Sequence, residues 1–172
     1  MADVILTVSK RHAEIISKYM PECRDKIIVQ YNPLPPIPQI KKKLDNIPTF
    51  LYVGGDSYLK GFHVLIQSIR YIASKPLKIK FILTNSYRED ALKMINILNK
   101  IYGNKIQVLG LISRQKLFSI HQKVWALVFP SIWEEPLPYA VLESALVGTL
   151  PIASRVGGIE EIVNNTCAEK FL

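Results

Sequence analysis

Residues 126–158 read ALVFPSIWEEPLPYAVLESALVGTLPIASRVGG, and this stretch indicates the fold class. A short apolar run ends at Pro130, an apolar helical segment closes at Gly148, and a second short apolar run follows it. Short buried strands that alternate with helices are typical of βαβ units, in which the strands run parallel. The alternation predicts strands at 50–53, 79–83, 106–109, 126–129 and 150–153, and helices at 62–73, 89–102, 114–122, 139–147 and 159–163. The sequence therefore predicts an α/β fold with a doubly wound parallel sheet.

The residues before this pattern divide into two segments. Residues 1–32 predict a strand–helix–strand piece whose helix begins after Ser9, a plausible N-cap. Residues 33–48 combine several prolines with the run Lys41–Lys43. Proline cannot donate a hydrogen bond to a sheet ladder, so we expect an extended linker here. The main α/β domain is then expected at 49–172.

The composition is that of a globular protein. Of 172 residues, 49% are hydrophobic and 21% are charged. No apolar run approaches the ~20 residues that span a bilayer, and the first residues do not resemble a signal peptide, so a cytoplasmic location is expected. Cys23 and Cys167 lack the spacing of metal ligands, and no metal site is predicted.

The formal net charge is +8, which favours an anionic partner: nucleic acid, an anionic membrane surface or a phosphate-bearing ligand. Much of this charge lies in Lys41–Lys43 and in Lys75, Lys78 and Lys80. Lysines that are simply solvated on surface loops explain the same pattern, and both interpretations stay open. No aromatic residues interleave with these lysines as an RNA-stacking surface requires, so no nucleic-acid partner is expected.

Ligands of doubly wound sheets bind beyond the C-terminal ends of the strands, which narrows the search to a few loops. The first, at 54–60, reads GGDSYLK and leads into a helix. Its glycines let the backbone approach a ligand, and Lys60 places a cation at a helix N-terminus, where positive charge is unfavourable. A bound phosphate would offset that cost. A tight turn with a solvated lysine is the alternative interpretation.

The loop at 130–138 and the helix that follows it carry two glutamates. Glu135 lies just ahead of the helix, and Pro138 suits the first helical position, where its missing N–H would have no partner. Glu143 falls in the second turn among almost entirely apolar neighbours, where a carboxylate is costly unless it is hydrogen-bonded. Hydroxyls of a sugar or a ribose are suitable donors. A glutamate that reaches solvent or pairs with a lysine is the alternative.

Taken together, these loops resemble the C-terminal domain of the retaining GT-B glycosyltransferases of family 4, the glycogen-synthase-like group of glycosyl transferases. The matching motifs are Val53–Gly61, the set Pro130, Ser131, Glu135 and Glu143 with seven residues between the two glutamates, and Gly148–Glu161. Each motif alone is weak, but their order along the chain is specific. The resemblance covers most of the chain and implies the Rossmann-like half of a GT-B fold.

The resemblance implies a nucleotide-diphosphate sugar as donor substrate, transfer with retention of anomeric configuration, and no cofactor or metal ion. Glu135 would contact the donor sugar near the reacting carbon, Lys60 would bind the diphosphate, and Glu143 would hold the ribose hydroxyls. The other donor-binding residues that it implies are Gly54 and Gly55, Leu111 and Ile112 beside the base, and Ser131, Leu137, Pro138 and Tyr139.

The chain departs from the family's pattern at several positions. The arginine that usually follows the first glycine is Gly55, so one diphosphate cation is missing unless Arg155 replaces it. Pro138 stands where the family has a glycine, and Pro136 precedes it. Residues 84–86, Thr-Asn-Ser, replace a frequent Gly-x-Gly.

The resemblance also bears on how much of an enzyme is present. Residues 1–32 look like a remnant of the family's N-terminal acceptor domain, and the chain stops at Leu172, before the closing helices expected of the family. We therefore expect a donor-binding fragment that is inactive alone. Its expected partners are the nucleotide sugar and the missing acceptor domain, and the basic charge favours peripheral membrane contact. A non-catalytic GT-B-like module that binds a protein partner or an anionic surface is the alternative, and a nucleotide-sugar epimerase of GT-B fold is a third hypothesis.

Overall fold

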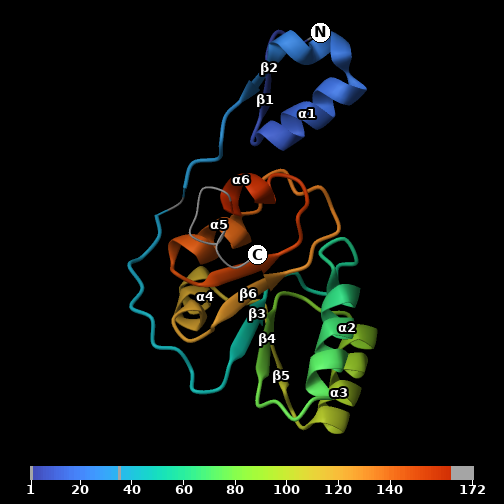
Figure 1. Cartoon of the computed structure of the whole chain (residues 1–172), viewed down its shortest axis with the longest axis vertical. Helices are drawn as coiled ribbons and strands as arrows, with labels where there is room; N and C mark the ends of the chain where they lie inside the picture. The colour runs from blue at the N-terminus through green and yellow to red at the C-terminus, as the bar shows by residue number, and fades with distance from the viewer. Residues whose placement is uncertain (1, 35, 164–172) are drawn as a thin grey trace.

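The computed structural model describes residues 2–34 and 36–163 and confirms the doubly wound parallel sheet. Its strands pair in parallel in the order β5-β4-β3-β6-β7 (Figure 1). The bounds are Thr49–Tyr52 for β3, Lys80–Thr84 for β4, Ile106–Gly110 for β5, Ala126–Phe129 for β6 and Leu150–Ala153 for β7. Each predicted strand is present, with small shifts at its ends. Cys167 and the last part of the predicted domain lie outside the described residues.

Helices cover both faces of this sheet. They are α2 Phe62–Ala73, α3 Glu89–Tyr102, α4 Arg114–His121, α5 Tyr139–Leu146 and α6 Ile159–Val163. In Figure 1, α2 and α3 lie on one side of the sheet and α4 and α5 on the other. Successive residues of β3 point to opposite faces, so Tyr52 packs with α2 and α3 while Leu51 packs against α4. None of the helices among the described residues is long and apolar enough to cross a membrane.

Local signals account for most helix ends. Gly103 takes a φ of 81° at the end of α3, as predicted, and Ser113 caps α4 by accepting from the amide of Lys116. The prediction that Pro138 occupies the first helical position is wrong. Its φ of −74° suits a helix, but its ψ of 116° is extended, so Pro138 is the N-cap and α5 begins at Tyr139. The pyrrolidine ring restricts φ and leaves ψ to the surrounding loop.

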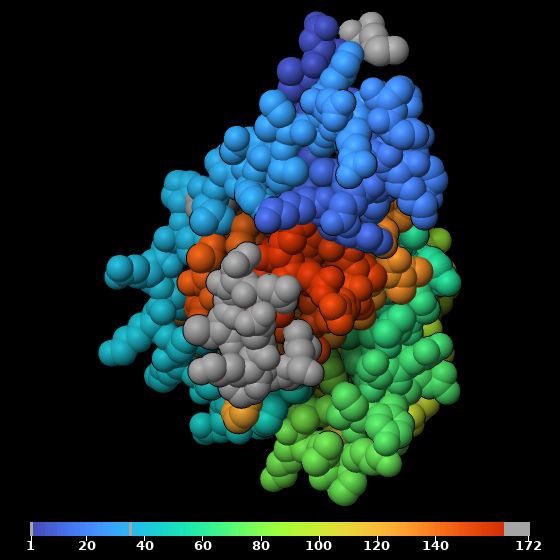
Figure 2. Space-filling model, turned by 45° about the horizontal axis from the view of Figure 1, so that its top comes forward, coloured from blue at the N-terminus to red at the C-terminus, as the bar shows by residue number. Residues whose placement is uncertain are grey.

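The residues before the linker form a small unit of their own. It consists of β1 Ile5–Thr7, α1 Lys10–Tyr19, the 3₁₀ helix η1 Pro21–Lys26, and β2 Ile27–Val29, which pairs in parallel with β1. Ser9 caps α1 as predicted, because its hydroxyl accepts from the amide of His12 at 3.2 Å. In Figure 2 this unit, in blue, rests directly on the orange and red residues of the C-terminal part of the domain.

The described residues of the linker form neither helix nor strand and run along the side of the α/β domain (Figure 1). Lys42 anchors the linker to the α/β domain through hydrogen bonds. Its Nζ donates to the carbonyls of His121 and Val124, the latter at 3.1 Å, and to the hydroxyl of Thr149 at 2.8 Å. Burial lowers the pKa of Lys42. Lys42 is therefore part of the internal packing, whereas Lys41 and Lys43 are exposed, as expected for a solvated run.

Candidate functional site

The topology of the sheet brings two of the predicted loops together. β3 and β6 are neighbours although the chain forms β4 and β5 between them, and a crevice opens beyond the strand ends at such a switch point. The loop after β3 carries Lys60, and the loop after β6 carries Glu135. The Nζ of Lys60 lies 2.6 Å from Oε1 of Glu135. Two residues that the sequence marked separately are thus direct partners.

Glu135 is 5% exposed, and a carboxylate this buried needs partners. Besides Lys60, the hydroxyl of Ser131 lies 2.9 Å from Oε1 of Glu135 and 3.0 Å from the carbonyl oxygen of Leu59, and its single proton can serve either acceptor. Both groups meet Oε1. Within the described part of the chain no group hydrogen-bonds Oε2, so that oxygen is free to accept from a ligand.

Close packing of two loop backbones holds Lys60 in place. Gly61, with a φ of 74°, is the N-cap of α2, and a Cβ added there would lie 1.7 Å from the carbonyl oxygen of Pro130. Only glycine lets these two backbones approach so closely. A hydrogen bond of 3.0 Å from the amide of Ile132 to the carbonyl of Leu59 joins the same loops.

Glu143 belongs to a neighbouring cluster between α4 and α5. Its side chain is 13% exposed, and its Oε1 lies 2.7 Å from Nη2 of Arg114. The carboxylate therefore pairs with an arginine at a pocket wall, which neither sequence-based interpretation included. The pocket has a volume of about 720 Å³, within the range of small-molecule sites, and is lined by Pro33, Leu34, Ile112, Arg114, Leu117, Tyr139 and Glu143.

Between these two clusters lie the first amides of α5. Pro138 has no N–H to offer, and its carbonyl accepts from Val141 and Leu142 at 3.2 and 3.3 Å. The amides of Tyr139 and Ala140 have no hydrogen-bond partner among the described residues. Unpaired amides at a helix N-terminus favour an anion. With prolines at 136 and 138, the loop thus still leaves two backbone amides unpaired at the start of α5.

The structure gives physical reasons for two departures from the family's pattern. Gly55 has a φ of 63°, and a Cβ added there would lie 2.7 Å from the carbonyl oxygen of Ser86, so an arginine would not fit this backbone. Asn85, in the segment that replaces Gly-x-Gly, takes a φ of 84°, a conformation that asparagine tolerates better than most residues. Its side-chain oxygen accepts from the amide of Ser86 at 2.8 Å.

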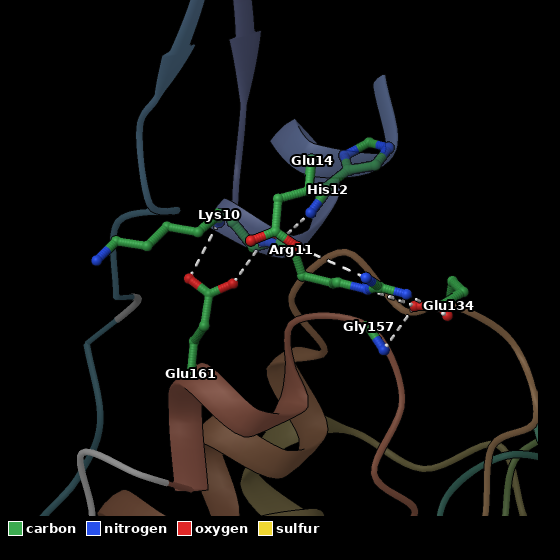
Figure 3. Close-up of polar contacts among 8 residues, drawn as sticks. Lys10, Arg11, His12, Glu14, Glu134, Gly157 and Glu161 are labelled. Atoms are coloured by element: carbon green, nitrogen blue, oxygen red, sulfur yellow. Dashed lines mark hydrogen bonds and ion pairs between the residues drawn. The ribbon is translucent and has the colours of Figure 1, made fainter. Parts of the chain in front are cut away.

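The small N-terminal unit contacts the α/β domain through two carboxylates, Glu134 and Glu161 (Figure 3). The first is Glu134, which accepts from Nη2 of Arg11 at 3.2 Å and from the amide of Gly157 at 2.8 Å. The Arg11 guanidinium holds the pKa of Glu134 below its ordinary value. Because Glu134 adjoins Glu135, and the carbonyl of Glu135 accepts from the amide of Gly158 at 2.8 Å, this contact is connected directly to the site.

The second carboxylate, Glu161 of α6, caps a helix far away in the sequence. It accepts from the backbone amides of Lys10 and Arg11 at 3.0 and 2.9 Å, and from the hydroxyl of Tyr31 at 2.7 Å. Burial raises its pKa, but the hydrogen bonds outweigh burial and the net shift is downward. Since α1 has no acidic residue in its own first turn, Glu161 supplies the negative charge that its N-terminus favours.

The remaining predicted residues lie on the rim or in the core. Leu111 is 76% exposed beside the pocket, while Leu137 packs into the core cluster around α5 and α6. Gly54 lies against the hydroxyl of Tyr52, the side chain that packs beneath this loop. Arg155, which the sequence offered as a replacement cation, is 83% exposed and pairs with Glu160.

Sequence reasoning did not identify Arg114, Glu134 or Glu161 as functional. Arg114 could have been found from the sequence, because it immediately follows the helix N-cap Ser113, just as Lys60 immediately precedes the N-cap Gly61. No sequence signal pointed to Glu134 or Glu161, because most of the groups that they bind lie in the N-terminal unit. The histidines stay outside the site: His12 and His121 contact Thr7 and Thr149, and His63 stacks on Tyr58. No group of three His, Cys, Asp or Glu side chains within the described ranges could hold a metal ion.

The fold is that of the C-terminal domain of a GT-B glycosyltransferase. The family model for glycosyl transferases group 1 matches residues 35–169, and the chain belongs to this family. An uncharacterized glycosyltransferase of Methanocaldococcus jannaschii is 25% identical over 94% of this chain and 44% of its own length. The chain thus spans less than half of that protein.

Solved structures share the fold. HepE of Anabaena, solved with UDP and glucose, has a TM-score of 0.72 at 18% identity, over 94% of this chain and 47% of HepE. The catalytic domain of starch synthase IV from Arabidopsis thaliana, bound to ADP and acarbose, has a TM-score of 0.71 at 15% identity, over 93% and 41%. Sucrose-phosphate synthase from Thermosynechococcus elongatus has a TM-score of 0.69 at 23% identity, over 94% and 43%.

Proposed function

We propose that this chain binds a nucleoside-diphosphate sugar and forms the donor half of a retaining, family 4 glycosyltransferase. One observation carries the proposal. Two nearly buried carboxylates lie on opposite sides of the unpaired amides that begin α5, and each is paired with one cation: Glu135 with Lys60, and Glu143 with Arg114. Polar groups that converge in this way at the switch point of an α/β sheet mark a ligand site.

The parts of the site correspond to the parts of such a donor. The pocket beside Glu143 suits the nucleoside, with the carboxylate accepting from ribose hydroxyls. The amides of Tyr139 and Ala140 and the ammonium of Lys60 suit the diphosphate. Oε2 of Glu135 is open to a sugar hydroxyl. In transfer, negative charge develops on the leaving diphosphate, and a cation with helix-terminal amides stabilises it without a metal ion.

The ligands of related structures support the same class of donor. HepE was solved with UDP and glucose, and starch synthase IV with ADP, so proteins of this fold hold nucleoside diphosphates with different bases. The retaining course and the absence of a metal are inferred from the family 4 resemblance. The acceptor would be bound with the help of parts that lie beyond this chain in proteins such as HepE, of which the chain covers 47%.

Titration of the chain with UDP, GDP and ADP by calorimetry or NMR tests the proposal. We expect at least one of them to bind, with amide shifts at Tyr139 and Ala140. Glu143→Gln should weaken binding, since each lost hydrogen bond from a ligand hydroxyl to a charged acceptor costs about 1.5–3 kcal/mol. The exposed cation Lys116 offers a matched control, and Lys116→Ala should bind as the wild type does.

Lys60 needs a paired design, because its removal would leave Glu135 buried without its cation. We therefore compare Lys60→Ala with the double variant Lys60→Ala/Glu135→Gln, which leaves no unpaired charge. Both should lose diphosphate affinity while only the single variant loses stability. If no nucleotide binds the wild type at millimolar concentration, the donor-site proposal fails and a non-catalytic module is favoured.

A further inference from the structure

The edge of the sheet opposite the donor site is strongly basic. In a parallel sheet the segments that precede the strands all lie at one edge, and here these are 41–48, 74–79, 103–105, 122–125 and 147–149. Together with the end of α3 and the start of β4 they contain Lys41, Lys42, Lys43, Lys75, Lys78, Lys80, Lys100, Lys105 and Lys123. We call this set the basic edge.

Hydrogen bonds join these segments into one continuous surface. The amide of Asp45 donates to the carbonyl of Lys123 at 2.9 Å, and the amide of Lys80 donates to the carbonyl of Pro48 at 2.9 Å. The Nζ of Lys105 donates to the carbonyl of Leu77 at 3.1 Å. The basic edge is therefore a single face of the domain, although its lysines are scattered along the sequence.

This charge is not compensated within the described ranges. Asp45 is the one acid in the segments that form the basic edge, and none of the ion pairs among residues 2–34 and 36–163 involves its lysines. Lys42 and Lys105 satisfy internal carbonyls, and the other lysines are exposed. Repulsion among uncompensated charges on one face is relieved by an anionic partner.

Exposed apolar side chains lie among these lysines. Leu44 is 47% exposed, Leu77 50% and Trp125 44%, and the ammonium of Lys75 stands 4.8 Å from the ring centroid of Tyr71, which is 69% exposed. The fold thus places Tyr71 and Trp125 among lysines with which no aromatic residues were found to interleave in the sequence. Aliphatic and aromatic side chains interspersed with lysine are typical of surfaces that bind the interface of an anionic bilayer. The basic edge contains no arginine, the residue whose bidentate fork is favoured where nucleic acid is recognised.

We propose that the basic edge docks on a bilayer rich in anionic phospholipids. The lysines contact the lipid phosphates, while Leu44, Leu77 and Trp125 insert between the headgroups. Because Lys60 and Glu135 follow the C-terminal ends of the strands, docking leaves the donor site open on the opposite edge. Vesicle binding and nucleotide binding are then independent, so this surface stands whether or not the proposed donor function holds.

Co-sedimentation of the chain with vesicles of phosphatidylcholine alone, or with phosphatidylglycerol added, tests the surface. We expect binding only to the anionic vesicles, and loss of binding in 1 M salt, where the screening length falls to about 3 Å. The variant Lys43→Glu/Lys78→Glu/Lys123→Glu should bind at least about 100-fold more weakly, since each lysine near such a surface contributes roughly five-fold. Among residues 2–34 and 36–163, none of these three side chains has a hydrogen-bond or ion-pair partner.

The matched control is Lys18→Glu/Arg24→Glu/Lys116→Glu, which changes the net charge equally at exposed positions away from the basic edge. It should retain most of the binding. An equal loss in both triple variants would mean that net charge alone attracts the chain, and would overturn the proposal. So would equal binding to neutral vesicles, or displacement of the chain from vesicles by an RNA oligomer at equal phosphate concentration.

A fluorescence readout reports insertion directly. The chain has two tryptophans, and in a Trp133→Phe background the emission comes from Trp125 alone. Anionic vesicles should shift this emission to shorter wavelength, and Leu77→Ser should reduce the binding that remains at moderate salt. Emission that stays unchanged when the chain co-sediments with vesicles would show that another face binds them.

Discussion

The substitution Glu161→Gln tests how the N-terminal unit is held on the α/β domain. The carboxylate accepts hydrogen bonds from the amides of Lys10 and Arg11 and from the hydroxyl of Tyr31. Glutamine keeps the shape but has one acceptor oxygen, and its NH₂ group would face donors. At least one hydrogen bond to a charged acceptor is lost, worth about 1.5–3 kcal/mol, together with about 0.3–1 kcal/mol of helix-dipole stabilisation. We expect a total of about 2–4 kcal/mol.

Amide hydrogen exchange measures this loss where it occurs. A loss of about 2–4 kcal/mol corresponds to local opening that is roughly 30- to 900-fold more frequent, so Lys10 and Arg11 should exchange faster by that factor. The buried strand β6 should exchange as in the wild type. Glu160→Gln is the control, because the adjacent Glu160 pairs only at the surface, with Arg155. Unchanged exchange at Lys10 and Arg11 would refute the capping role of Glu161.

Three further outcomes follow from single side chains. Lys42→Met should lower the free energy of unfolding in urea by about 1–3 kcal/mol, because it removes the donor that buried oxygens share, while Lys41→Met should change it by less than about 0.5 kcal/mol. Gly55→Arg, which restores the family's residue, should lower Tm, since the left-handed backbone costs about 1–2 kcal/mol before the clash with Ser86; a gain in nucleotide affinity at unchanged Tm would contradict this. Burial, with the nearby Lys42 charge, lowers the pKa of His121 from 6.5 to about 4. The free energy of unfolding of the wild type should therefore fall as pH falls from 6.5 to about 4. In urea titrations at each pH, His121→Gln should show a weaker dependence on pH.

The sequence alone predicted the elements of the fold well, because its signals are local. The apolar run at 126–129 and the helix at 89–102 have the bounds that their patterns indicated, and Gly103 and Ser9 end and begin helices as expected. The order of the motifs also indicated the family to which the chain belongs. The position of Pro138 was wrong by one residue, since ψ depends on where the loop leads.

The tertiary structure alone decided which residues meet. Lys60 contacts Glu135, and Arg114 contacts Glu143, because β3, β5 and β6 end at the same edge of one sheet, and no local pattern encodes the distance between two loops. Glu161 caps a helix some 150 residues away. The burial of Lys42 was equally hidden, since its acceptors are mainly backbone carbonyls, which every residue carries. Residue types mark what a side chain can do, and the fold decides which partner it finds.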